Sequence, residues 1–167
     1  MTTEEAQQEF MAQAEPQEEH RWLQRLVGEW TYEGKAIMGP GQPPVTMQGA
    51  VTARPFGGLW VMIEERGDPA RSDARTNIFT FGYSPQKQRF IGTFVDSEST
   101  FLWVYDGWLD GNVLTLESEG PAMAGPGTAT YHDVVELVDD DHWVLRSLVP
   151  GEDGQWQEFM TSHYRRK

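Results

Sequence analysis

The sequence contains no cysteine among its 167 residues. It therefore forms no disulfide, offers no thiolate to a metal ion and has no cysteine nucleophile. The lack of disulfides suits a reducing compartment, and we expect a cytoplasmic protein. The first residues, Met1 to Glu5, lack the basic and apolar stretches of a secretory signal. The longest apolar runs, such as residues 59–63, are far too short to cross a bilayer.

Basic residues are also scarce, with 13 Lys and Arg against 26 Asp and Glu and a formal net charge of −13. The only cationic cluster is Arg165-Arg166-Lys167. Such an acidic chain repels nucleic acid and anionic lipid surfaces. We therefore expect neither nucleic acid nor membrane among its partners.

Sequence motifs of enzymes are missing as well. There is no Gly-x-Ser-x-Gly, no phosphate-binding P-loop and no Gly-x-Gly-x-x-Gly. The run Asp139-Asp140-Asp141-His142 lacks the spacing of a calcium loop, and an acidic hairpin tip explains it better. The sequence thus predicts no catalytic residue, no metal site and no cofactor.

The chain begins with polar, helix-compatible segments. Residues 1–15 are rich in Glu, Gln and Ala and predict a loose helix or a disordered tail, while residues 16–167 form the folded domain. Pro16 suits the first turn of a helix, and Gly28 suits its end. Apolar side chains recur between them at helical spacing, at Trp22, Leu23, Leu26 and Val27. This helix is expected to cover one end of the domain.

From Trp30 onward the apolar period changes to two, which is typical of β-strands. After the first strand, further strands are predicted at about 45–54, 58–66, 76–83, 88–95, 100–109, 112–119, 128–138, 142–149 and 155–165. Short turns such as Asp110-Gly111 force neighbouring strands to pair antiparallel. Closure of such a meander removes its two open edges. We therefore predict an all-β fold: an up-and-down antiparallel β-barrel of about ten strands, of the lipocalin or calycin type, with an N-terminal helix. A two-sheet sandwich is the alternative.

Five motifs occur in order along the chain: Gly28-Glu29-Trp30, Gly57-Gly58-Leu59-Trp60, Gly82-Tyr83-Ser84-Pro85, Leu102-Trp103-Val104-Tyr105 and Phe159-Met160-Thr161-Ser162-His163-Tyr164. With them the chain resembles the domain of unknown function 1579 family, a bacterial family grouped with calycin-like barrels. The resemblance covers roughly residues 20–166. It implies a lipocalin-like barrel, and it supplies no catalytic or binding residues.

In calycins a tryptophan of the first strand packs beneath a cation of the last strand, a cation–π contact that closes one end of the barrel. Trp30 matches the tryptophan position. Arg165 is the better candidate for the cation and Arg166 the second, because the parity of the last strand is uncertain by one residue. We interpret this pair as structural.

Aromatic side chains alternate along several strands and are the candidates for a ligand site. The expected binding residues are Tyr32, Phe79, Phe81, Phe101, Trp103 and Tyr105. If their face points inward, it either lines a cavity or simply fills the barrel, and both readings remain open. The opposite face is also apolar, so part of the outer wall is covered either by the helix or by a second copy in a homodimer.

His163 is expected to be the polar contact of this site, because counting by two from Phe159 places both on one face. A histidine inside an aromatic barrel could ligate haem iron, as in the nitrobindins, which this arrangement resembles. Tyr32 departs from that family, where a small residue stands at this position, and it would crowd a macrocycle. A hydrogen-bonded structural histidine is the favoured interpretation.

The leading hypothesis is reversible binding of a small, largely hydrophobic molecule inside the barrel. A competing hypothesis is an enzyme of the isomerase or lyase type that uses the same pocket. A third is a filled barrel that works through its outer surface as an oligomer.

Overall fold

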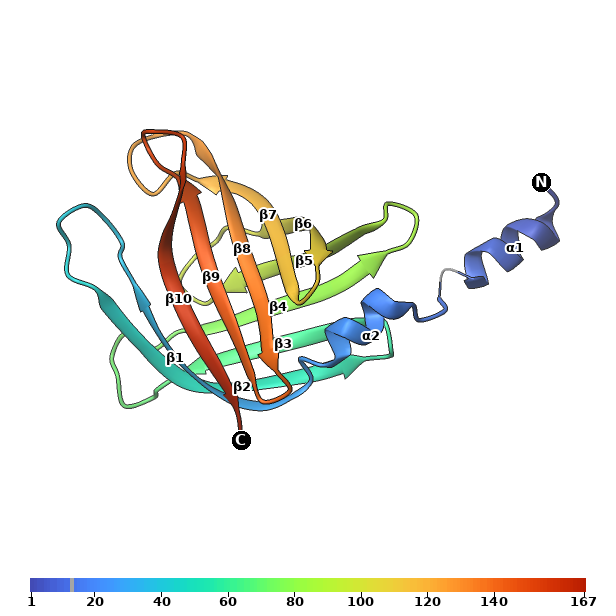
Figure 1. Ribbon diagram of the computed structural model, residues 1–167, viewed down its shortest axis with the longest axis horizontal. Helices are drawn as coiled ribbons and strands as arrows, with labels where there is room; N and C mark the ends of the chain where they lie inside the picture. Colours follow the sequence, from blue (N-terminus) through green and yellow to red (C-terminus); the bar gives the residue numbers. More distant parts are fainter. Residues whose placement is uncertain (13) are drawn as a thin grey trace.

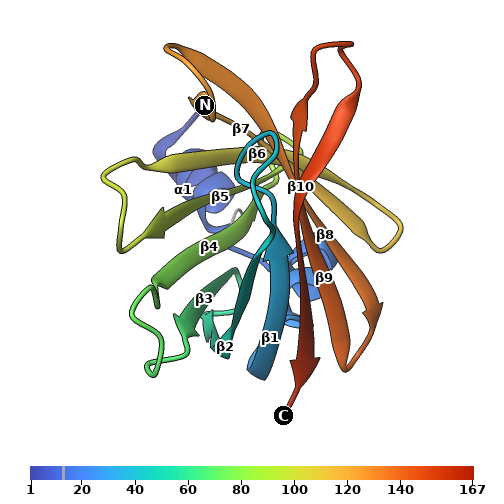
Figure 2. The same cartoon turned by 90° about the vertical axis from the view of Figure 1, so that its left-hand side faces the viewer.

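Ten antiparallel strands close into a barrel in the computed structural model, which describes residues 1–12 and 14–167. The strands are β1 (Gly28–Ala36), β2 (Val45–Phe56), β3 (Trp60–Gly67), β4 (Thr76–Ser84), β5 (Arg89–Asp96), β6 (Trp103–Asp110), β7 (Val113–Pro121), β8 (Thr128–Asp139), β9 (His142–Pro150) and β10 (Trp156–Arg166). Each strand pairs with its neighbours in sequence, and β10 returns to pair with β1. Figure 2 shows the two strands side by side where the ring closes. The predicted up-and-down barrel is confirmed.

Two helices precede the barrel. Helix α1 (Thr3–Ala12) has no buried residue and lies away from the barrel (Figure 1). The predicted tail of residues 1–15 thus contains a solvent-exposed helix, and its Gln13 lies outside the described residues. Within the described residues, neither helix has the length and apolar character needed to traverse a membrane.

Helix α2 (Glu18–Gln24) covers one end of the barrel. Its Trp22 and Leu23, with Leu26 just beyond, are buried in the core, which is the apolar stripe predicted for this segment. His20 links the N-terminus of this helix to the barrel. Its Nδ1 accepts a hydrogen bond from the backbone of Gln17 at 2.9 Å, and its Nε2 donates to the carbonyl of Tyr83 on β4 at 3.1 Å.

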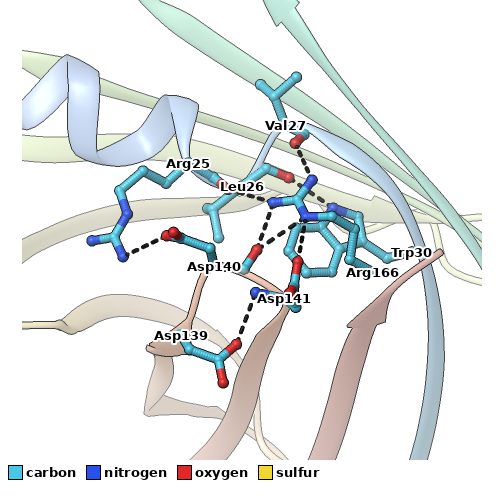
Figure 3. Close-up of polar contacts among 8 residues, drawn as sticks. All are labelled: Arg25, Leu26, Val27, Trp30, Asp139, Asp140, Asp141 and Arg166. Atoms are coloured by element: carbon cyan, nitrogen blue, oxygen red, sulfur yellow. Dashed lines mark hydrogen bonds and ion pairs between the residues drawn. The ribbon is translucent and has the colours of Figure 1, made fainter.

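A tryptophan and an arginine lock this covered end (Figure 3). The guanidinium of Arg166 lies 4.1 Å from the ring centre of Trp30, within the range of a cation–π contact. It also donates to the carbonyls of Val27 at 3.0 Å and Asp140 at 2.8 Å. Gly28 is required beneath it, because a β-carbon there would collide with the Arg166 guanidinium and its φ is +144°.

The cation in this lock is Arg166, so the assignment to Arg165 was wrong. Arg165 is exposed and pairs across the seam with Thr31, on the outer face of the wall. The cause is a β-bulge on β10 between Glu158 and Met160. The extra residue reverses which of the following side chains face inward and which face outward. The tip of the β8–β9 hairpin, the acidic run expected at residues 139–141, takes part in the lock through Asp140 and Asp141.

The covered half of the barrel is filled with side chains. Leu26, Trp30, Phe81, Leu114 and Trp143 are among those with almost no exposed surface. The buried set alternates along each strand with outward residues, as a period of two requires. The packed half leaves the opposite half of the barrel for a site.

Candidate functional site

A cavity of about 330 Å³ occupies the half of the barrel farthest from α2. Its lining includes Met38, after the end of β1, and Pro121 and Met123, at the end of β7. These residues stand at the opposite ends of their strands from the Trp30 lock. The wall of the cavity is mainly apolar and is formed by Ala36, Met47, Phe79, Phe94, Trp103, Leu145, Phe159 and Met160. This volume lies at the lower end of the range for small-molecule sites, roughly 300–1,000 Å³.

Four of the predicted ligand residues line the cavity: Tyr32, Phe79, Trp103 and Tyr105. Trp103 owes its position partly to Gly120 on β7, where a β-carbon would overlap the indole ring. The inward face of β4 and β6 was therefore read correctly from the alternation of their side chains.

Two other predicted aromatic residues lie elsewhere. Phe81 is buried in the core and contacts the ring of Tyr105 at 6.2 Å between centroids, but it does not line the cavity. Phe101 precedes β6, which begins at Trp103 and not near residue 100. Its ring meets the edge of Trp103 at 4.9 Å between centroids, and it is absent from the cavity wall.

His163 lies on the outside of the barrel, so its expected position in the pocket was wrong. The bulge at Phe159 puts Phe159 on the cavity wall and turns Thr161, His163 and Arg165 outward. His163 Nδ1 lies 3.0 Å from Nε2 of His142, also on the outer surface. Partial burial, with Arg165 and His163 nearby, lowers the pKa of His142. Haem bound inside the barrel could not reach this histidine.

Three acids line the cavity, and none was among the predicted binding residues: Asp96 is the last residue of β5, and the other two are Glu65 and Asp133. Glu65 on β3 is only 4% exposed, and Asp133 on β8 faces the cavity. A signal for Glu65 was present in the sequence: Val61, Ile63 and Glu65 share one face of a strand, so alternation alone places the acid among inward apolar residues. The neighbouring Glu64 points outward and pairs with Arg54 and Arg66.

The carboxyl groups of Glu65 and Asp133 are each held by two donors from other strands. Glu65 accepts hydrogen bonds from the hydroxyl of Tyr164 and, at 3.0 Å, from Nδ2 of Asn77. Asp133 accepts from the hydroxyl of Tyr105 and, at 2.6 Å, from that of Ser147. The two acids thus have fixed positions in the cavity before any ligand arrives.

Burial raises the pKa of both carboxyl groups, and their donors oppose that rise only in part. The negative charge of Asp133 adds to the rise at Glu65, so the two acids are coupled. Burial also raises the pKa of Tyr32 to about 12, with Glu65 as the second cause. Burial also raises the pKa of Tyr105 and Tyr164, so these two hydroxyls stay protonated at neutral pH and donate to the acids.

A column of stacked rings joins the cavity to the lock. Tyr32 stacks on Tyr164 at 5.8 Å, and Tyr164 lies flat on Trp143 at 3.6 Å with an interplanar angle of 5°. Trp143 in turn meets Trp30 edge-on at 6.2 Å. This packing restrains the Tyr164 hydroxyl that holds Glu65.

The cavity opens toward the loop between β3 and β4. A recess beside it shares Tyr32, Ala36, Met38, Met47, Arg75 and Asn77 with the cavity lining. It is completed by β2, by Gly67 at the end of β3, and by Asp68, Arg71, Asp73 and Ala74 of that loop. Arg75 itself is exposed, at the rim. A ligand could enter along this side. Within the described residues, no group of three or more metal-binding side chains occurs.

Comparisons with known proteins agree with the barrel. The sequence matches the family described as "Protein of unknown function (DUF1579)" over residues 15–166. A search among curated proteins found no match. Rv2717c from M. tuberculosis is similar in structure, with a TM-score of 0.62 and 13% identity over 92% of this chain and 99% of that one. The S-type phycobiliprotein lyase CPES from Guillardia theta has a TM-score of 0.57 and 11% identity over 91% and 98%. At these identities the likeness concerns the fold alone.

Proposed function

The chain belongs to the DUF1579 family, whose function is unknown. From its cavity we propose that the protein reversibly binds a small, largely hydrophobic molecule inside the barrel. The observation that carries the proposal is the apolar cavity of about 330 Å³ in a barrel whose other half is packed solid. A barrel that needed only stability could fill both halves with side chains. Apolar burial drives the binding, and each square ångström removed from water contributes about 25 cal/mol.

The test is the binding of a neutral fluorescent probe, N-phenyl-1-naphthylamine, to the full chain. We expect saturable binding with one probe per barrel. Ala36→Trp would place a large ring in the cavity and abolish it, since Ala36 is 4% exposed and lines the wall. Lys35→Trp is the matched control, because Lys35 is the adjacent residue on the same strand and is exposed on the outer face. Equal binding by both variants would show that the probe sits elsewhere.

A second candidate function is proton transfer in the same cavity, of the isomerase or lyase type. It is favoured by the two buried carboxyl groups, each hydrogen-bonded to a tyrosine and each with a raised pKa. A buried carboxyl group whose pKa is raised above its ordinary value is suited to act as a general base or acid. The test is incorporation of solvent deuterium beside the carbonyl group of 4-phenyl-2-butanone, followed by NMR. Exchange by the wild type that is lost in Asp133→Asn would support catalysis. Identical exchange in both proteins would count against it.

A further inference from the structure

The charged residues of the cavity are unbalanced. Those on its lining are Glu65, Arg75, Asp96 and Asp133, three acids and one base. Among the described residues, no arginine, lysine or histidine forms an ion pair with Glu65 or Asp133. Arg75 is exposed at the rim, where water screens it. The nearby His132 lowers the pKa of Asp133 but pairs with Glu117 instead. Neither Glu65 nor Asp133 therefore has an ion-pair partner among the described residues.

One buried hydrogen-bond acceptor beside the two acids also lacks a donor among the described residues. The donors of Tyr164, Asn77, Tyr105 and Ser147 are all directed at the two carboxyl groups. Because the amide nitrogen of Asn77 faces Glu65, its Oδ1 is buried and receives no hydrogen bond from any described residue. A buried acceptor without a donor costs free energy that a ligand can recover. The Asn77 amide oxygen is therefore a second observation, separate from the two acids, that indicates a ligand with a hydrogen-bond donor.

We propose that the molecule bound in this barrel carries a protonated amine, which lies between Glu65, Asp133 and Asn77 while its apolar body lies against Phe79, Trp103 and Met160. The inference rests on the proposed binding function and names the chemical class of its ligand. An ammonium group supplies up to three donors and a positive charge, which match the free acceptors and the unpaired acids. A carboxylate ligand would further disfavour ionisation of Glu65 and Asp133, and an alcohol could satisfy an acceptor but would not favour the ionised form of either acid.

The number of protons released on binding distinguishes an amine ligand from a neutral one. In the free protein, burial favours the neutral forms of Glu65 and Asp133. An ammonium group beside them favours the ionised forms, so amine binding releases protons to the solvent. Tyr32, Tyr105 and Tyr164 do not contribute, since burial and the nearby acids raise the pKa of each hydroxyl. A neutral ligand at the same place releases none.

The experiment compares three ligands with one body and different heads: 4-phenylbutylamine, 4-phenylbutanol and 4-phenylbutyrate. Calorimetry in two buffers of different ionisation enthalpy, at several pH values from 5 to 8, gives the affinity and the protons released. For the wild type we expect the amine to bind at least tenfold tighter than the alcohol, the carboxylate to bind most weakly, and the amine alone to release protons. The double variant Glu65→Gln with Asp133→Asn should bind amine and alcohol equally, with no proton release. Glu33→Gln, an exposed change on the outer face of β1, is the matched control and should behave as the wild type.

The outcomes separate this inference from the proposed function. If the alcohol or the carboxylate binds as tightly as the amine, the inference that the ligand carries an amine is refuted, while the proposed binding in the cavity stands. If the amine preference persists in the double variant, the acids do not set it and the inference is refuted. If none of the three ligands binds and the naphthylamine probe does not bind either, the proposed function itself fails. Thermal melts and far-UV circular dichroism of each variant confirm that it is folded, and single variants replace the double variant if it is not.

Discussion

Replacing Arg166 with alanine is expected to destabilise the protein far more than the same change at Arg165. Arg166 covers Trp30 at 4.1 Å and donates to the carbonyls of Val27 and Asp140. A cation–π contact is worth about 0.5–2 kcal/mol, and a charge-assisted hydrogen bond about 1.5–3 kcal/mol before allowance for exposure. Because the Arg166 side chain is 31% exposed and the contacts share one group, we discount the sum to about 2–4 kcal/mol.

For a chain of this size, that loss corresponds to a fall in Tm of about 5–15 °C. Arg165→Ala removes an exposed side chain and should change the free energy of unfolding by no more than about 0.5 kcal/mol. Arg166→Lys keeps the charge but loses the planar fork that reaches two carbonyls, so an intermediate value is expected. Urea denaturation of the three variants, followed by fluorescence, measures all of this. Equal losses at Arg165 and Arg166, or a larger one at Arg165, would refute the assignment of the lock.

Three further predictions concern the cavity and the outer wall. The pKa values of Glu65 and Asp133 are raised in the folded state. Above pH ~4 the folded state therefore binds more protons than the unfolded chain, and the free energy of unfolding falls as the pH rises from there. Urea midpoints from pH 4 to 8 should therefore fall more steeply for the wild type than for the double variant Glu65→Gln with Asp133→Asn, with Glu33→Gln as control, and parallel curves would contradict this. Gly120→Ala should displace the Trp103 ring, lower the free energy of unfolding by about 1–3 kcal/mol and weaken probe binding, as urea denaturation and probe titration would measure. Unchanged stability and probe binding would contradict the dependence of the ring on Gly120. Ile78, Val95 and Val104 are exposed apolar residues on the outer wall. If a second copy covers them, light scattering at micromolar concentration should give the mass of a homodimer, and a monomeric mass would contradict the homodimer expected from the sequence.

The fold was predictable because its signals are periodic and repeated. Ten apolar segments with a period of two, joined by turn residues, leave few topologies open, and closure follows from the need to remove edges. Small errors at strand ends, such as the start of β6, did not disturb this result, since many neighbouring strands over-determine the pairing.

The site was less predictable because one inserted residue reverses which side chains of a strand face inward. One extra residue at Phe159 turned His163 and Arg165 outward and brought Arg166 over Trp30, and no composition signal marks that bulge. Glu65 is the opposite case. The alternation of Val61 and Ile63 already pointed it inward, but an acid among apolar residues is usually assumed to face water. Taking the alternation literally would have identified it.

The pairing of β10 with β1 has a consequence for how the protein folds. Every other ladder joins strands adjacent in the chain, whereas this seam joins Trp30 to Arg166 across almost the whole sequence. Loop-closure entropy therefore makes the seam the costliest ladder to form, and we expect it to form last, after the local hairpins. Until it closes, β1 and β10 are two open edges, and the chain is most prone to aggregate. The Trp30–Arg166 contact lies on this seam, so we expect it to form in the last step of folding.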